Sequence, residues 1–180
     1  SEGHLDPSSS GFINIVNDLE KSVHASSLLL DNLLEWTKRQ SSTIPFEPKL
    51  TTIYPVVAEG VSFLRENAKN KNITIEFDVP DEIQAYFDIV TLNTVFRNLI
   101  SNAIKFTPEN STIKIRSGEN EEYIDISVLD TGIGMSEKIV QMIFEDNELH
   151  TSPGTGNERG SGLGLYVVKE FVEKNNGKLS

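Results

Sequence analysis

The 180-residue sequence contains no cysteine. This absence excludes disulfide bonds, thiolate nucleophiles and thiolate zinc sites, and it fits a reducing compartment. The sequence also lacks any apolar run long enough for a membrane span or a signal peptide. We therefore expect a cytoplasmic chain, which can still be the cytosolic part of a larger, membrane-anchored protein.

Basic residues are few: 16 Lys and Arg stand against 27 Asp and Glu, and the formal net charge is -11. Broad binding to nucleic acid or to anionic membranes begins with basic side chains that neutralise phosphate, so we expect no nucleic-acid partner. A phosphorylated ligand would need local donors or a metal ion. With 37% hydrophobic residues the chain can bury one real core, with a second small element beside it.

Residues 1–11 are small, polar and patternless, so we exclude them from fold reasoning as a disordered tail or cloning remnant. Residues 12–41 predict a long coiled-coil-like helix, because small or apolar residues recur there in alternating steps of four and three. The helix could pack on its own domain, but we favour a homodimer through residues 12–39. Two prolines, Pro45 and Pro48, lie in the linker at residues 42–48 and separate this helix from the rest of the chain.

Residues 49–180 predict a mixed α/β domain. Asp88 is a plausible N-cap for a helix that runs to Phe106, with Pro108 as its stop. Two antiparallel strands are expected between residues 111 and 130. The remaining expected elements are strands at 49–53 and 72–80, helices at 54–70, 136–144 and 162–177, the last ended by Gly177, and the beginning of a strand at 178–180.

The helix "DIVTLNTVFRNLISNAIKFTP" places Asn98, Asn102 and Lys105 on one face, apart from its apolar stripe. Asn is a poor helix former, so two of them carry a propensity cost that a function can compensate. An amide oxygen is a suitable ligand for magnesium, and Lys can reach a phosphate oxygen. From this helix alone, an ordinary solvated face is an equally good interpretation.

The stretch "VLDTGIGM" ends a strand at Asp130 and continues with Gly132 and Gly134. One interpretation is a common strand-ending turn. The other is an adenine pocket, in which the Asp130 carboxylate accepts from the exocyclic amino group and the glycines let the backbone approach the ring.

The stretch "ERGSGLGLYVVKEF" alternates glycines and then enters a helix. It is neither a Walker motif nor a dinucleotide fingerprint. A phosphate loop is modestly favoured over a flexible linker, because glycines that lead into a helix N-terminus bind anions. Arg159 adds one cation beside it.

Together these motifs, in this order, resemble the ATP-binding domain of sensor histidine kinases. Its N box, first glycine box, F box and second glycine box correspond to "NLISNAIKFTP", "DTGIGM", Phe144 in "MIFEDNEL" and "GSGLGL". The resemblance covers residues 46–180. It implies an α+β fold, a two-layer sandwich with a mixed sheet and helices on one face, and a domain at 49–180 that is truncated at its C-terminal strand.

The resemblance also implies roles for single residues. Asn102 would bind Mg²⁺ with help from Asn98, Lys105 would contact a phosphate, and Phe106 would lie along the ATP. The adenine pocket would comprise Asp130, Gly132, Ile133 and Gly134. Phe144 would anchor a lid over the ATP, at about residues 145–160. The phosphate-contacting hinge would comprise Arg159, Gly160, Ser161, Gly162, Leu163, Gly164 and Leu165.

The resemblance extends to relatives of the same fold that hydrolyse ATP. These relatives share a Glu one helical turn before the magnesium-binding Asn. This chain has Asn98 there, which cannot take a proton near neutral pH. Phosphoryl transfer to another acceptor is therefore favoured over hydrolysis. An ATPase and an ATP-gated binding module without catalysis remain the alternatives.

None of the three histidines, His4, His24 and His150, has the sequence context of the family's phosphorylated histidine. The helix at 12–39 resembles the second helix of the family's dimerisation hairpin, which carries no acceptor. The resemblance therefore implies an acceptor-histidine helix upstream in the full-length protein, a response-regulator receiver domain as a further partner, and two-component signalling by a larger receptor.

Overall fold

The computed structural model describes residues 15, 16, 19, 23, 46–119, 123–144, 154–156 and 162–180. Four positions of the expected dimerisation helix fall within this set, and Ile15, Val16, Leu19 and Val23 are helical and exposed. The remainder of that helix, the tail at 1–11 and most of the linker lie outside the described residues.

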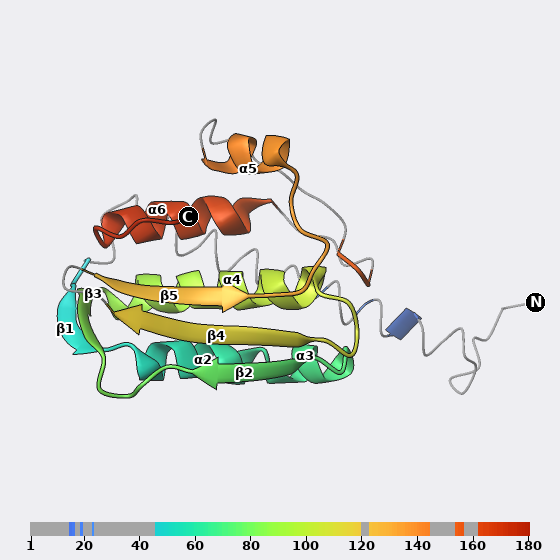
Figure 1. Cartoon of the computed structure of the whole chain (residues 1–180), viewed down its shortest axis with the longest axis horizontal. Helices are drawn as coiled ribbons and strands as arrows, with labels where there is room; N and C mark the ends of the chain where they lie inside the picture. Colours follow the sequence, from blue (N-terminus) through green and yellow to red (C-terminus); the bar gives the residue numbers. More distant parts are fainter. Residues whose placement is uncertain are drawn as a thin grey trace, which may run out of the picture.

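The described elements are strands and helices in mixed order (Figure 1). In chain order they are β1 (Lys49–Thr52), α2 (Tyr54–Phe63), α3 (Arg65–Asn70), β2 (Thr74–Asp78), β3 (Gln84–Phe87), α4 (Ile89–Phe106), β4 (Thr112–Glu119), β5 (Ile124–Leu129), α5 (Glu137–Phe144) and α6 (Leu163–Lys174).

The main sheet has the strand order β2-β4-β5. β2 pairs with β4 in parallel, with Ile75 opposite Ile113, and β4 pairs with β5 antiparallel, with Ile115 opposite Val128. β1 and β3 form a separate antiparallel pair. The mixed α/β architecture predicted from the sequence is thus confirmed, whereas β3 was not predicted.

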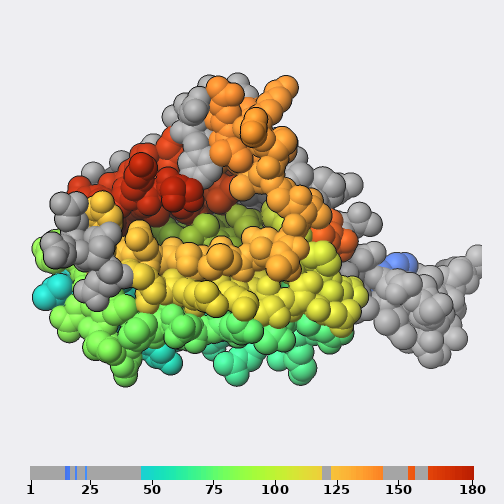
Figure 2. All heavy atoms as spheres, viewed as in Figure 1, coloured from blue at the N-terminus to red at the C-terminus, as the bar shows by residue number. Residues whose placement is uncertain are grey.

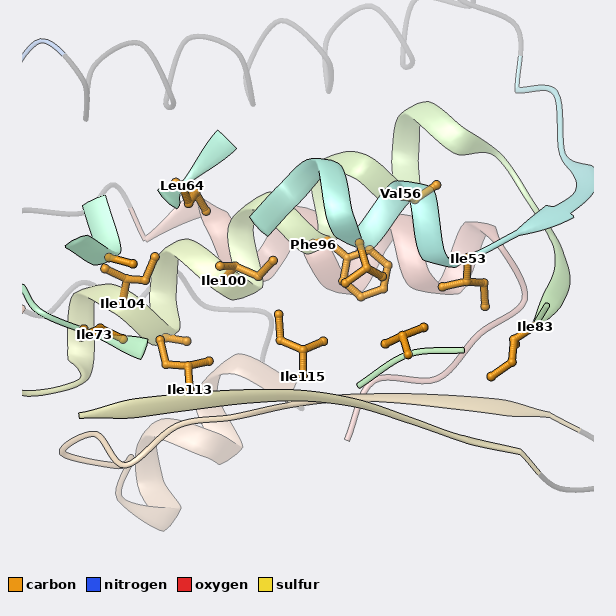
Figure 3. Packing of buried hydrophobic residues seen from close by; sticks show 14 of the residues in the cluster. Ile53, Val56, Leu64, Ile73, Ile83, Phe96, Ile100, Ile104, Ile113 and Ile115 are labelled. Carbon is orange, nitrogen blue, oxygen red and sulfur yellow. The ribbon is translucent and has the colours of Figure 1, made fainter. Parts of the chain in front are cut away.

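Alternation along the strands sorts side chains between the two faces of the sheet. Ile113 and Ile115 of β4 are fully buried and point toward the helices, as Figure 3 shows. On the other face Lys114 of β4 pairs with Glu76 of β2, Nζ to Oε2 at 3.2 Å, and both side chains are about half exposed. One face of the sheet therefore carries the core, and the other meets solvent.

α4 lies at the centre of the domain. One side of it packs with α2 on the sheet, and Phe96, Ile100 and Ile104 contribute to this core (Figure 3). Another side packs against α6, where Val95 meets a small buried cluster. That cluster is completed by Val167, Val168 and Phe171. α4 is therefore held from two directions, and its polar residues have fixed positions.

The predicted cap of α4 is confirmed. Asp88 is 4% exposed, and its Oδ1 accepts from the Thr91 N–H at 2.9 Å. Two other segments meet the same residue: the Glu47 N–H donates to Asp88 Oδ2 at 3.0 Å, and the Asp88 N–H donates to Asn175 Oδ1 at 2.8 Å. Asn175 follows α6 and also donates through Nδ2 to Thr91 Oγ1 at 2.9 Å.

Two expected boundaries were wrong. The helix expected at 54–70 is interrupted at Leu64, where α2 gives way to α3. α6 ends at Lys174, and Asn176, with φ of 59°, takes the left-handed position after the helix in place of Gly177. The strand expected to begin at 178–180 has no pairing partner in the described part of the chain, and it stays a prediction.

Candidate active site

The N-box side chains lie on α4 where it faces α6. Asn98 is 3% exposed, and its Nδ2 donates to the Thr94 carbonyl one turn earlier at 2.8 Å. Asn102 and Lys105 are half-buried on the following turns. The buried amide of Asn98 is therefore oriented by its own helix, while Asn102 and Lys105 remain accessible to a ligand.

The second glycine box meets this amide face directly. A Cβ placed on Gly164 would lie 2.8 Å from Asn98 Oδ1 and 3.9 Å from Asn102 Nδ2. The first distance is shorter than a carbon and an oxygen atom tolerate, so the contact requires glycine. The first turn of α6 therefore lies against the two asparagines, as the order of the motifs led us to expect.

The start of α6 is suited to an anion. Gly162 precedes the helix with φ of 75°, and no side chain at that position caps the first turn. N–H groups in the first turn of a helix, together with the helix dipole, attract negative charge. Leu163, Gly164 and Leu165 form this first turn and are half-buried.

The first glycine box packs on the carboxyl end of α4. A Cβ on Gly132 would lie 2.6 Å from the Phe106 carbonyl oxygen, so glycine is needed here too. The Ile133 N–H donates to that same carbonyl at 3.2 Å. The Gly132 N–H donates to Asp130 Oδ1 at 2.7 Å. This bond closes the turn that was one of the two interpretations of the motif. A carboxylate has further lone pairs, so this bond leaves Asp130 able to accept from a ligand.

Lys105 and Gly134 were also predicted as site residues. Lys105 Nζ is 4.5 Å from the centre of the Phe106 ring, a distance typical of a cation–π contact. Gly134 has φ of 67° and no atom near its missing side chain, so it bends the chain without packing constraints. Phe144 is the last residue of α5, while Arg159, Gly160, Ser161 and most of the lid at 145–160 lie outside the described residues.

The donor set fits magnesium held through phosphates. Within the described ranges, no three His, Asp or Glu side chains come together as a metal cluster. Asn102 offers a hard amide oxygen, and Mg²⁺ commonly takes one or two protein ligands with the rest from phosphates and water. The site can thus hold a metal that arrives with a nucleotide.

The figures show how α4 is reached from outside. In Figure 2 atoms of α4 are visible in a recess between α6 and β5, and the segment that leads to α5 borders one end of it. Figure 1 shows the same segment leaving β5 beside the carboxyl end of α4.

Two residues beside this site were not predicted from the sequence. Lys71 and Thr155 both contact the carboxyl end of α4: Lys71 Nζ lies 3.1 Å from the Lys105 carbonyl oxygen, and the Thr155 N–H donates to the same oxygen at 3.0 Å. No local pattern could have indicated them, because their partners are 34 and 50 residues away in the chain.

Residues 87–180 match the family described as Histidine kinase-, DNA gyrase B-, and HSP90-like ATPase. The match spans more than half of the chain, which therefore belongs to this nucleotide-binding family. Among its members the chain is similar to histidine kinases, so the resemblance to their ATP-binding domain is confirmed. Within the described residues, no helix has both the length and the apolar character to cross a membrane.

Two curated relatives illustrate the similarity. Histidine kinase P4 of Formosa agariphila is 31% identical over 165 residues, which are 89% of this chain and 12% of the relative. Histidine protein kinase SaeS of Staphylococcus aureus is 33% identical over 171 residues, covering 90% of this chain and 47% of the relative. The chain thus spans less than half the length of either relative.

The histidine kinase ThkA provides the structural comparison. Its catalytic domain is 25% identical with a TM-score of 0.61, covering 72% of this chain and 82% of that one. ThkA in complex with the response regulator protein TrrA has a TM-score of 0.67 at 24% identity, covering 98% of this chain and 48% of that one.

Proposed function

We propose that this chain is the ATP-binding catalytic part of a sensor histidine kinase, a protein-histidine kinase that transfers the γ-phosphoryl group of ATP to a histidine outside this sequence. The observation that carries the proposal is the close approach of Gly164 to Asn98 and Asn102 at one part of α4, and of Gly132 to Phe106 at its end. Three motifs that are distant in sequence thereby come near one helix, and we infer that they line one site. The names of the relatives support the reaction type.

Each residue would act on a different part of the nucleotide. Asn102 would bind Mg²⁺ through its amide oxygen, and Lys105 would contact a phosphate with its ammonium group. The first turn of α6 would face the phosphates with its N–H groups. Asp130 would accept from the adenine amino group, while Ile133 and Phe106 would contact the ring and sugar side of the nucleotide.

The magnesium ion, when bound, would neutralise phosphate charge and so stabilise the charge that develops during transfer. The protein residues would align the γ-phosphorus with an incoming imidazole nitrogen. The nitrogen–phosphorus bond forms while the bond from the γ-phosphorus to the bridging oxygen breaks, and ADP leaves. A neutral imidazole already carries the attacking lone pair, so no base is needed at position 98. In the relatives that hydrolyse ATP, by contrast, the Glu at this place would act as a base toward water.

The proposed partners follow from the same assignment. The acceptor histidine would lie on a helix upstream in the full-length protein, and residues 12–39 would join it in a homodimer. A response-regulator receiver domain would take the phosphoryl group, in keeping with the ThkA structure that contains a response regulator protein. The protein would work as the cytosolic part of a larger receptor.

Phosphotransfer can be tested directly with γ-labelled ATP. The chain is incubated alone and with a separately supplied helical hairpin that carries the acceptor histidine. We expect label on the hairpin and little on the chain itself. Binding of ATP without any transfer, together with ATP-dependent affinity for a partner, would support the gated binding module instead. Steady phosphate release would support a hydrolase, which the asparagine at position 98 disfavours.

A further inference from the structure

The last carbonyl groups of α4 bind a lysine from another part of the chain. Lys71 Nζ donates to the Ile104 carbonyl at 2.8 Å and to the Lys105 carbonyl at 3.1 Å. The last four carbonyls of a helix have no partner within it, and the helix dipole makes them negative. An ammonium group is therefore well placed there.

Lys71 also connects this helix end to residues 154–156. Its Nζ donates to Thr155 Oγ1 at 2.7 Å. The Thr155 hydroxyl is in turn 3.1 Å from the Lys105 carbonyl oxygen and 2.9 Å from the Thr107 carbonyl oxygen, so it can donate to either one. The Thr155 N–H donates to the Lys105 carbonyl at 3.0 Å.

The position of Lys71 is itself fixed by the backbone. It follows α3 in the turn that leads to β2, and its carbonyl accepts from the Asn110 N–H at 3.0 Å. Its side chain is partly buried at the contact with α4. The ammonium has three donors, and three oxygens from two segments lie within hydrogen-bonding distance of it.

The same end of α4 belongs to the candidate active site. Lys105 and Phe106 are its last two residues, and the Phe106 carbonyl accepts from Ile133 of the first glycine box. The helix end is thus bound by the first glycine box, by Thr155 and by Lys71. Thr155 belongs to the range in which the sequence predicts the lid.

We propose that Lys71 is a positioning residue for the nucleotide site: it binds Thr155 to the carboxyl end of α4 and so fixes Lys105 and Phe106 relative to residues 154–156. This role rests on the proposed nucleotide binding, but the contact itself exists without a ligand. Lys71 acts through Thr155 and the helix carbonyls, and not on the phosphates.

The first test measures amide hydrogen exchange of Thr155 in the ligand-free protein. Lys71→Met keeps the aliphatic stem and removes the three donors. We expect Thr155 to exchange at least about threefold faster in this variant, because loss of a hydrogen bond to a charged group shifts local opening by that much or more. Unchanged exchange would overturn the proposal.

Lys69→Met is the matched control, since it removes the same charge two residues away. Lys69 is 76% exposed, and its ion pair with Glu66 is 4.0 Å long on the surface. We expect wild-type exchange at Thr155 in this variant. An equal acceleration in both variants would indicate a general charge effect and would also overturn the proposal.

The second test is a double-mutant cycle on ATP affinity, measured by calorimetry with Lys71→Met, Thr155→Val and the double variant. Each single change should weaken ATP binding about threefold to tenfold, and the double variant should be little weaker than either, because both changes break one connection. Thr155→Ser, which keeps the hydroxyl, should bind like wild type. Thr155 is exposed, so these replacements leave the core intact.

The outcomes separate the two proposals. Full additivity in the cycle would overturn the positioning role while leaving nucleotide binding intact. A wild-type chain that binds no ATP would overturn the proposed function, and with it the role of Lys71 in affinity, even if the exchange of Thr155 had responded as expected.

Discussion

Asp130 combines a structural and a proposed ligand-binding role in one carboxylate. Its Oδ1 holds the turn through the Gly132 N–H at 2.7 Å. The amide of Asp130→Asn keeps one acceptor oxygen, so the turn should persist while the charge that favours the adenine amino group is lost. We expect ATP binding to weaken by about 1.5 to 3 kcal/mol, the typical contribution of a charge-assisted hydrogen bond.

Calorimetry with ATP measures this loss, and thermal unfolding of the same variant reports on the fold. GTP serves as the comparison, because guanine has an acceptor where adenine has its amino group. An unchanged affinity for ATP would remove Asp130 from the nucleotide site.

Gly164 offers a steric test of the same site. In Gly164→Ala the added methyl group would lie 2.8 Å from Asn98 Oδ1, so α6 or Asn98 must shift. We expect ATP affinity to fall at least about tenfold, equivalent to 1.4 kcal/mol, because the first turn of α6, which we propose to face the phosphates, moves away from the asparagines. Gly118→Ala is the control, since its Cβ would make only an ordinary 3.9 Å contact with Asp125.

Calorimetry again provides the measurement, with circular dichroism to verify that both glycine variants fold. If Gly164→Ala bound ATP as tightly as Gly118→Ala does, the first turn of α6 would not be part of the site.

At the level of single residues, the sequence located much of the candidate site. Asn98, Asn102 and Gly164 come together as the motif order predicted, because N box and glycine boxes have local sequence signatures. Lys71 and Thr155 could not be predicted in this way. Their partners are backbone carbonyls, which have no signature in the sequence.

At the level of elements, α4 shows when local signals suffice. It runs from Ile89 to Phe106 as predicted, because Asp88 caps its first turn and Pro108 follows its end. The break at Leu64 between α2 and α3 has no such signal, since neither glycine nor proline stands there. β3 was missed because its strand character depends on pairing with β1, about 35 residues earlier in the register.

The capping network of α4 yields a prediction about stability. Asp88→Ala removes the N-cap and leaves the N–H groups of Thr91 and Glu47 without their acceptor. We expect the free energy of unfolding to fall by about 2 to 4 kcal/mol, which combines a lost cap with buried hydrogen bonds. Urea denaturation measures the change.

Asp125→Ala, at an exposed position of β5, removes the same charge and serves as the control. It should lower the free energy of unfolding much less than Asp88→Ala does. Asn175→Ala should destabilise the protein as well, and its effect should not add fully to that of Asp88→Ala, because both side chains contact the Thr91 hydroxyl, Asp88 as its acceptor and Asn175 as a donor to it. Full additivity would indicate that the helix ends are stabilised independently.

For the whole molecule, net charge decides how an anionic nucleotide can bind. The chain carries a formal charge of -11, which opposes the approach of ATP. Magnesium lowers the charge of the nucleotide and would join it to Asn102. We expect removal of Mg²⁺ by a chelator to weaken ATP binding by at least about tenfold, or 1.4 kcal/mol.

Titration calorimetry with and without the chelator tests this expectation. In Asn102→Ala the difference between the two conditions should shrink, because the protein ligand is missing. Equal affinity in both conditions for the wild type would exclude a metal-assisted site.

Asp88 joins two segments that are remote in sequence: the Glu47 N–H reaches its carboxylate at 3.0 Å, and Asn175 accepts from its backbone N–H at 2.8 Å. The segment before β1 and the end of α6 therefore both lie at the amino end of α4. The amino end of α4 thus holds three segments together, and we expect these segments to open and close as one cooperative unit in hydrogen exchange.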